Sequence, residues 1–208
     1  MKGLLLKDLY MMKQYCKYYL FCAIGFTVLS LMSTDNMFFT FYPCLLCGMI
    51  PVNLMGYDER SGWMQFSETM PYTRIQLVSG KYLIGLFVQI TVLIIMGSAQ
   101  GIKMMITGEF AFRDYITLIL LLVIVSMITS SITLPFIFKL GVEKGRTAYY
   151  VMIGFVCGAS VVVSDLFSGH LGIELNSNFV LPIFAIIGVG IYAFSWYMSI
   201  LFYKKREL

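Results

Sequence analysis

The sequence predicts an all-α integral membrane protein with six transmembrane helices. Apolar residues make up 59% of its 208 residues and charged residues only 12%, whereas an ordinary soluble domain has about 25% charged residues. A helix that crosses a bilayer needs about 20 mostly apolar residues. We therefore expect about six spans, no sizeable water-soluble part, and a single transmembrane domain over residues 1–208.

Long apolar runs locate the expected spans. They lie at about residues 18–34, 38–55, 82–106, 115–138, 148–167 and 179–203. Pro43, Pro51 and Pro135 fall within these runs or near their ends. Proline removes a backbone donor and can kink a helix, so we expect bends at these positions rather than helix ends.

The basic residues give the orientation of the spans. Thirteen of the fifteen lysines and arginines lie in the N-terminal segment, in the loops after the second and fourth spans, and in the C-terminal tail. Only Lys103 and Arg113 lie in the alternate loops. Because cytoplasmic loops carry an excess of lysine and arginine, both termini are expected to be cytoplasmic.

The N-terminal segment, residues 1–17, has the pattern of an amphipathic helix in the membrane interface. On a helical projection its lysines share one face, and leucine, methionine and tyrosine lie mostly opposite. Such a helix lies with its apolar side in the bilayer and its basic side toward anionic headgroups. Asp8 interrupts the apolar side, so a group other than lipid is expected to cover it. A short basic leader without structure is the alternative.

The loop after the second span, residues 57–74, reads YDERSGWMQFSETMPYTR. Trp63, Phe66 and Met70 follow the i, i+3, i+7 spacing of one helix face, which predicts a helix from about residue 59 to 69. Asp58 is expected to be its N-cap and Pro71 to follow its end. Three acids, Asp58, Glu59 and Glu68, would face anionic lipid unfavourably, so this segment is expected to dock on a protein partner.

A second helix is expected to start directly after this segment. Thr73 and Gln76 have the spacing of a capping box, in which each side chain bonds the other residue's backbone N–H. The new helix would run through Lys81 into the third span.

Polar side chains inside the spans are few. Gln89 and Gln100 are expected on one face of the third span, in interhelical hydrogen bonds or, alternatively, lining a transport path. Asp165 lies near the outer end of the fifth span, where a solvated position is favoured over a functional one. Gly154 and Gly158 form a G-x-x-x-G pattern that permits close helix packing.

The sequence offers little for bond chemistry. The chain has one histidine, no cluster of metal ligands, and in GVEKGRT a glycine spacing that does not fit a phosphate loop. Cys44 and Cys47 form a C-x-x-C inside an apolar run, which favours packing over redox chemistry. We expect no catalytic residue, metal or cofactor on this chain and no nucleic-acid partner. Energy for any uphill transport would have to come from another polypeptide.

The start MKGLLLKDLY, the six spans and the loop from Gly56 to Tyr82 resemble the small permease subunits of ABC-2-type transporters. The similarity is greatest to bacterial exporters of amphipathic peptides, such as those for phenol-soluble modulins or bacteriocin immunity. The resemblance implies a permease in the bacterial cytoplasmic membrane, in contact with lipid. It also implies two copies of a separate ATP-binding cassette subunit, which binds ATP and Mg²⁺, and a second permease copy or paralogue.

In this family the loop after the second span supplies a coupling helix that sits in a groove of the ATPase. On this chain the resemblance assigns that role to residues 57–74, including Asp58 and Pro71, with the apolar residues as buried anchors and the charged ones at the rim. The anchors would be Trp63, Met64, Phe66 and Met70, and the rim charges Glu59, Arg60, Glu68 and Arg74.

Two alternatives from other classes remain at this point. One is an intramembrane enzyme that uses Asp165 or the pair Cys44 and Cys47. The other is a membrane scaffold that recruits a cytoplasmic partner without transporting anything.

Overall fold

The computed structural model describes residues 2–32, 37–108, 111–147, 149–151, 154 and 177–205. This part of the chain is helical and contains no strand. The helices are α1 (Lys2–Tyr15), α2 (Lys17–Met32), α3 (Met37–Gly48), α4 (Ile50–Arg60), α5 (Trp63–Glu68), α6 (Arg74–Thr107), α7 (Phe112–Leu140) and α9 (Ser177–Lys205). Residues 142–147 form a further helical segment.

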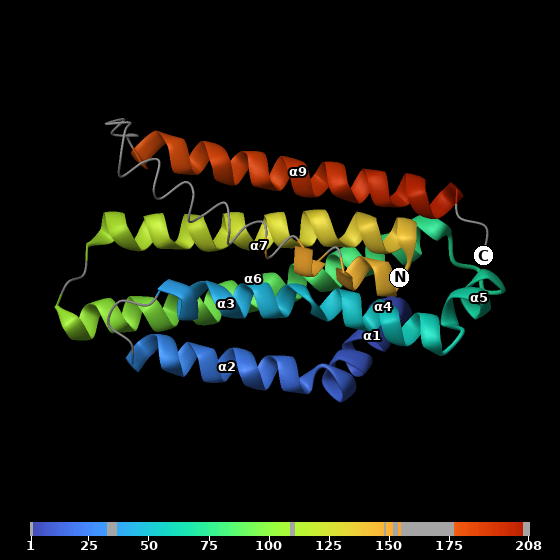
Figure 1. Cartoon of the computed structure of the whole chain (residues 1–208), viewed down its shortest axis with the longest axis horizontal. Coiled ribbons are helices and arrows are strands. Elements are labelled where there is room, and N and C mark those ends of the chain that lie inside the picture. Colours follow the sequence, from blue (N-terminus) through green and yellow to red (C-terminus); the bar gives the residue numbers. More distant parts are fainter. Residues whose placement is uncertain are drawn as a thin grey trace.

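The long helices lie side by side in one bundle (Figure 1). In the described part, four helices are long and apolar enough to cross a membrane: Phe38–Arg60, Arg74–Thr107, Phe112–Leu140 and Pro182–Lys204. The pair α1 and α2, bent by 66° at their junction, makes a fifth if it forms one span. The described part thus supports four to five spans. The expected span 148–167 lies almost entirely outside the described residues, so the total of six stays a prediction.

The prolines have different effects. Pro43 lies inside α3 and Pro135 inside α7, so these helices continue through them as expected. Pro51 instead stands in the first turn of α4, directly after the break at Met49. Proline is well tolerated there because the first turn of a helix has no intrahelical acceptor for its N–H.

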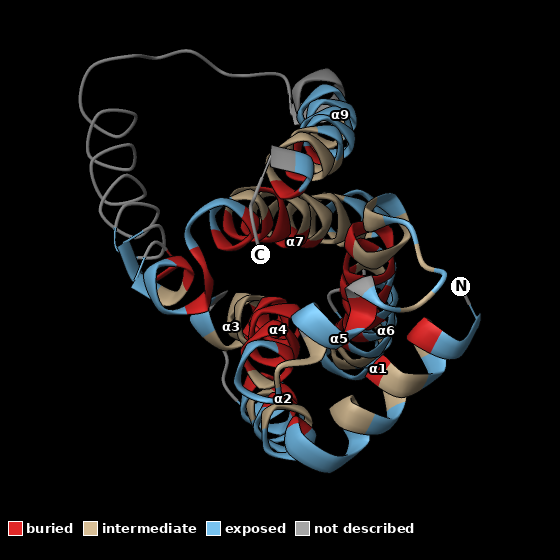
Figure 2. Ribbon diagram, turned by 90° about the vertical axis from the view of Figure 1, so that its right-hand side faces the viewer, coloured by how far each residue is buried: buried red, intermediate tan, exposed pale blue. Residues whose placement is uncertain are grey.

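Buried residues lie where the helices face each other, and exposed residues lie on the outward faces (Figure 2). Many of these exposed residues are large and apolar. One buried group joins α2, α3, α4, α6 and α7, and a second joins α4, α6, α7 and α9. Exposed large apolar residues such as Phe21, Ile94, Ile106 and Ile186 cover the outside. Such a surface is expected where lipid, rather than water, surrounds the helices.

Helix α6 begins where the sequence predicts. The Thr73 hydroxyl accepts a hydrogen bond from the Gln76 backbone N–H at 3.3 Å, and the Gln76 side-chain oxygen accepts one from the Thr73 N–H at 3.2 Å. The predicted capping box is therefore confirmed. From this cap α6 runs as one helix of 34 residues.

Candidate functional site

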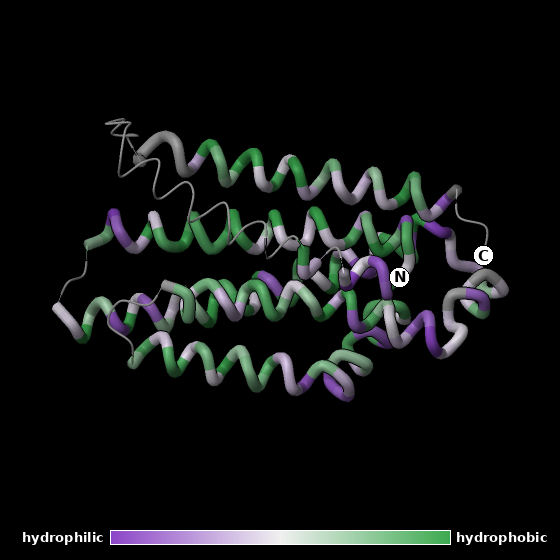
Figure 3. The backbone as a smooth tube through the Cα atoms, in the orientation of Figure 1, coloured by the Kyte–Doolittle hydropathy of each residue, from purple (hydrophilic) through white to green (hydrophobic). Residues whose placement is uncertain are grey.

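Hydrophilic residues gather mainly at the end of the bundle that carries α5 (Figure 3). The start of α6 meets α1 and α4 there through ion pairs, and Arg74 reaches the last turn of α9. The described chain therefore begins and ends at the same end of the bundle. We call this the charged end; the basic residues predict it to be cytoplasmic.

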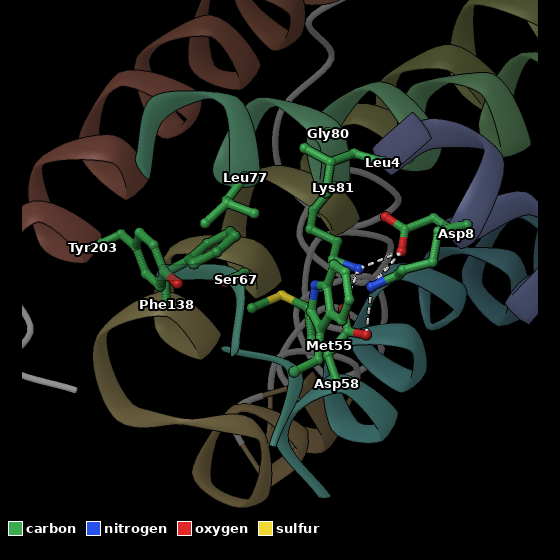
Figure 4. Close-up of a pocket in the computed structure, with 12 residues that line it drawn as sticks. Leu4, Asp8, Met55, Asp58, Ser67, Leu77, Gly80, Lys81, Phe138 and Tyr203 are labelled. Carbon is green, nitrogen blue, oxygen red and sulfur yellow. Dashed lines mark hydrogen bonds and ion pairs between the residues drawn. The ribbon is translucent and has the colours of Figure 1, made fainter. Parts of the chain in front are cut away.

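An ion cluster of four residues, Lys7, Asp8, Asp58 and Lys81, lies at the centre of the charged end (Figure 4). The Lys81 Nζ atom donates to Asp8 Oδ1 at 2.8 Å and to Asp58 Oδ2 at 2.6 Å. The Lys7 Nζ atom donates to Asp58 Oδ1 at 2.6 Å and lies 3.3 Å from Asp8 Oδ1. The cluster thereby ties α1, α4 and α6 together.

Three of the four members are almost completely buried. Asp8 is 3% exposed, Asp58 is 2% exposed and Lys81 is 8% exposed. Two ammonium groups face two carboxylates, so the charges of the cluster sum to zero. Charges so deeply buried are tolerable only while each keeps its partners, which makes the relative positions of these three helices interdependent.

Helix α5 is linked to this cluster through Trp63. The Lys7 Nζ atom lies 4.2 Å from the centre of the Trp63 ring, a cation–π contact. Trp63 and Ser67 line a small cavity of about 30 Å³ together with the cluster, and Ser67 is 1% exposed. One side of α5 therefore packs against the ion cluster.

The expected helix over residues 59–69 is wrong in its extent. Helix α4 continues to Arg60, and α5 begins only at Trp63. Gly62 separates the two helices with φ 67°, a left-handed conformation that glycine adopts readily. Asp58 is consequently not an N-cap, because it lies within α4 and its carboxylate is held by two lysines.

The charges of the segment are used inside the chain. The Glu59 carboxylate accepts a hydrogen bond from the Val142 N–H at 3.1 Å. Arg74 donates to the carbonyls of Tyr203 at 3.4 Å and Lys204 at 3.2 Å. Lys7 and Lys81 neutralise the Asp58 carboxylate. Repulsion between Asp58 and anionic lipid is therefore not an argument for a protein partner at this residue. Arg60, in contrast, is exposed.

The opposite side of α5 faces outward. Phe66 is 53% exposed, Gln65, Thr69 and Pro71 are exposed, and Met70 is half-buried. Trp63 and Phe66 lie side by side as expected, with ring centres 5.7 Å apart, but Trp63 is half-buried and Phe66 is exposed. Met64 and Glu68 belong to α5, but their side chains lie outside the described part. We call Gln65, Phe66, Thr69 and Pro71 the outer face of α5.

An open depression of about 330 Å³ also lies at the charged end. Its walls come from the last turn of α4, from the end of α7 and from the segment that follows α7; they are Gly56, Glu59, Arg60, Leu140, Gly141, Val142, Glu143, Lys144 and Arg146. Arg146 donates to Asn53 Oδ1 at 3.0 Å and so holds the 142–147 segment against α4. The sequence did not predict a role for residues 142–147. Their glycine spacing only excluded a phosphate loop.

The two glutamines of α6 make hydrogen bonds between helices. Gln100 is 5% exposed and donates to both Ser30 of α2 and Thr40 of α3. Gln89 is 2% exposed and donates to Ser130 of α7 at 3.1 Å, whereas its Oε1 atom has no partner in the described part. Gln100 therefore joins three helices, and Gln89 joins two.

This difference predicts unequal effects on stability. Gln100→Met removes the donor that two buried hydroxyls share, so we expect the free energy of unfolding to fall by about 1–3 kcal/mol. Gln89→Met also removes an unsatisfied oxygen, so we expect a change below about 1 kcal/mol. Equilibrium unfolding of the purified variants in detergent measures both values. Equal losses at the two positions would contradict the assignment.

The whole described bundle matches one family model. The model of the ABC-2 family transporter protein matches residues 3–204. The chain belongs to the ABC-2 transporter family. It is thus a multi-pass membrane protein and a transport subunit rather than an enzyme. No curated protein and no solved structure matches the chain.

Other candidate residues of this ABC-2 protein do not join the charged end. Cys44 and Cys47 are fully buried among apolar residues of α3, α4 and α6. No group of three potential metal ligands occurs in the described residues. Gly154 is exposed, and no other helix of the described part comes within 4 Å of the place where a side chain would start. Asp165 and Gly158 lie outside the described residues, so both stay predictions.

The sequence only partly indicated the ion cluster of this ABC-2 protein. Asp8 interrupts an apolar face, and the expectation that a group other than lipid covers it is confirmed by Lys7 and Lys81. Lys81 was counted among the basic loop residues, although it is 8% exposed. Two features of the sequence together indicate the cluster. Asp8 is a single acid on the apolar side of one helix, and Lys81 is a single base next to the start of a span.

Proposed function

We propose that this ABC-2 protein is the permease subunit of an ATP-driven exporter that docks a separate ATP-binding subunit on the outer face of α5. The assembly would contain two ATP-binding subunits and two permeases, the second permease being another copy or a paralogue. It would lie in a bacterial cytoplasmic membrane. The proposed substrates are amphipathic or antimicrobial-type peptides, as the sequence resemblance suggests.

The observation that carries the proposal is the two-sided packing of α5. One side contacts the ion cluster through Trp63, and the other presents Phe66 outward at the charged end. A large exposed aromatic residue beside a polar rim is the usual anchor of a protein interface. Among the described residues, the ring of Phe66 contacts one other aromatic ring, that of Trp63.

The proposed mechanism transfers movement from α5 to the membrane helices. Nucleotide binding would draw the two ATP-binding subunits together and displace α5. Because Lys7 contacts Trp63 and also bonds Asp58, this displacement reaches α1, α4 and α6 together. ATP thereby biases the permease between two helix arrangements, each of which is populated without it.

Phe66→Ala tests the docking surface. Truncating an interface anchor costs about 2 kcal/mol or more, which corresponds to roughly 30-fold weaker binding of the ATP-binding subunit. We expect this loss in an affinity measurement with the detergent-solubilised permease, and a larger one for Phe66→Ala with Trp63→Ala. Phe112→Ala, which truncates a phenylalanine 68% exposed at the start of α7, is the matched control. Unchanged binding of the ATP-binding subunit to the double variant would contradict the docking proposal.

Transport in vesicles tests the function itself. The permease and its ATP-binding subunit, reconstituted together, are expected to move an amphipathic peptide only when ATP is present. Transport by the permease alone would contradict the energy source, and complete absence of peptide movement would favour the scaffold alternative. Alanine replacements of Cys44, Cys47 and Asp165 that leave ATP-driven transport intact would exclude the intramembrane enzyme.

A further inference from the structure

A cavity of about 270 Å³ opens between α2 and α6, away from the ion cluster. Helix α3 contributes Pro43 to its wall, and α1 contributes Met12. The remaining wall comes from residues 20–27 of α2 and 87–96 of α6. The cavity therefore lies beside the bend between α1 and α2 and extends along about two turns of α2 and the middle of α6.

The wall of this cavity is apolar. Its two hydroxyl groups donate within their own helices, Thr27 to the Ala23 carbonyl at 2.8 Å and Thr91 to the Phe87 carbonyl at 2.9 Å. The Thr27 hydroxyl also lies 3.1 Å from the sulfur of Met96. A cavity without free polar groups does not hold water well. Its preferred occupant is a hydrocarbon chain.

The mouth of the cavity faces the surroundings of the bundle. Ile24, Phe87 and Ile95 line it, and they are 57%, 55% and 44% exposed. All three lie in helices that are expected to be within the bilayer. A lipid chain can therefore enter from the side, without crossing a polar surface.

Basic residues stand at one end of the same wall. Lys17, Leu20, Ile24 and Thr27 follow i, i+3, i+7, i+10 spacing, so they share one face of α2. Lys17 is exposed, and its Nζ atom lies 5.3 Å from the centre of the Tyr18 ring. Lys13, also exposed, follows the lining residue Met12 in α1, on the other side of the 66° bend. Two positive charges thus stand one turn or less along the chain from lining residues, at the charged end.

We propose that this cavity binds one acyl chain of an anionic phospholipid, whose phosphate is held by Lys13 and Lys17. The acyl chain would lie in the apolar cavity, and the phosphate would contact the two lysines. Basic residues between helices on the cytoplasmic side are a known setting for anionic headgroups. The inference requires only that the chain lies in a membrane, and it is independent of docking at α5.

Photo-crosslinking of the intact protein in lipid nanodiscs tests the site. The probes are phosphatidylglycerol and phosphatidylcholine, each with a diazirine in the middle of one acyl chain. We expect phosphatidylglycerol to label residues 20–27 and 87–96 in preference to other exposed apolar faces. Val92→Phe, which adds a ring inside the cavity, should remove this labelling. The matched control on the same helix is Ile94→Phe, because Ile94 is 66% exposed and does not line the cavity.

A charge variant tests the headgroup contact without filling the cavity. One lysine near the membrane surface contributes about 1 kcal/mol to the binding of anionic lipid, so Lys17→Gln should lower phosphatidylglycerol labelling about fivefold. Labelling by phosphatidylcholine should not change. Lys2→Gln, at an exposed lysine near the start of α1, is the control.

Three results would overturn the proposal. One is equal labelling of the cavity by both lipids, and another is labelling spread evenly over all exposed apolar faces. The third is efficient disulfide formation between two copies carrying Ile24→Cys, which would show that a second permease covers the mouth. If Val92→Phe fails to fold, Ala23→Leu serves as the smaller filling variant and is judged by the same readout.

Discussion

Lys81→Met is expected to lower the free energy of unfolding by about 3–5 kcal/mol, the usual cost of removing one partner from a buried ion pair. Lys81 bonds both Asp8 and Asp58, so its loss leaves two buried carboxylates with only Lys7 between them. Equilibrium unfolding in detergent, followed by tryptophan fluorescence, measures the effect. Lys144→Met, at an exposed lysine, should change the same free energy by less than about 0.5 kcal/mol.

Replacing the buried charges together separates stability from coupling. A variant with Asp8→Leu, Asp58→Leu and Lys81→Met leaves only the partly exposed Lys7 without a carboxylate, so it should be more stable than Lys81→Met alone, which leaves two buried carboxylates sharing one lysine. If the cluster relays movement from α5, this variant should bind the ATP-binding subunit but hydrolyse ATP without transporting peptide. Normal transport by a stable triple variant would show that the cluster serves the fold alone.

Tyr82→Ala is expected to cost about 3–5 kcal/mol, the range for truncating a large buried aromatic side chain. The Tyr82 ring is fully buried and stacks on Trp196 with ring centres 5.4 Å apart. Its hydroxyl lies 2.8 Å from Ser195 Oγ and 2.7 Å from Ser199 Oγ, so it joins α6 to α9. Tyr82→Phe, which removes only the hydroxyl, should cost about 1–3 kcal/mol.

The control for this pair lies on the partner helix. Tyr197 of α9 is 60% exposed, and Tyr197→Ala should have a much smaller effect than Tyr82→Ala. The same unfolding measurement applies to all three variants. A similar loss for Tyr82→Ala and Tyr197→Ala would mean that the contact between α6 and α9 contributes little.

Local patterns predicted local structure well. The capping box at Thr73 and Gln76 needs only residues three positions apart, and the structure contains it. Apolar runs predicted most of the membrane helices for the same reason, since a span is a property of consecutive residues. The family resemblance was also confirmed, over nearly the whole chain.

Contacts between distant residues were not predictable in this way. The sequence around Asp58 fits an N-cap, but in the structure Asp58 lies within α4. Its carboxylate pairs there with Lys7 and Lys81, which belong to other helices. Trp63 and Phe66 have helical spacing, but the spacing does not show which ring contacts the rest of the protein. In the structure Trp63 contacts Lys7 of α1. Sequence periodicity identifies a helix face and leaves open what that face meets.

Helix α6 also has a mechanical consequence. With 34 residues and a rise of about 1.5 Å per residue, it is a rod about 50 Å long. Lys81 lies near one end of the rod. Gln100, which donates hydrogen bonds to α2 and α3, lies near the other end. Because α6 contains no proline and runs unbroken from Arg74 to Thr107, we expect a sideways displacement at Lys81 to tilt the whole helix. Such a tilt would move Gln100 relative to α2 and α3 at the other end of the bundle.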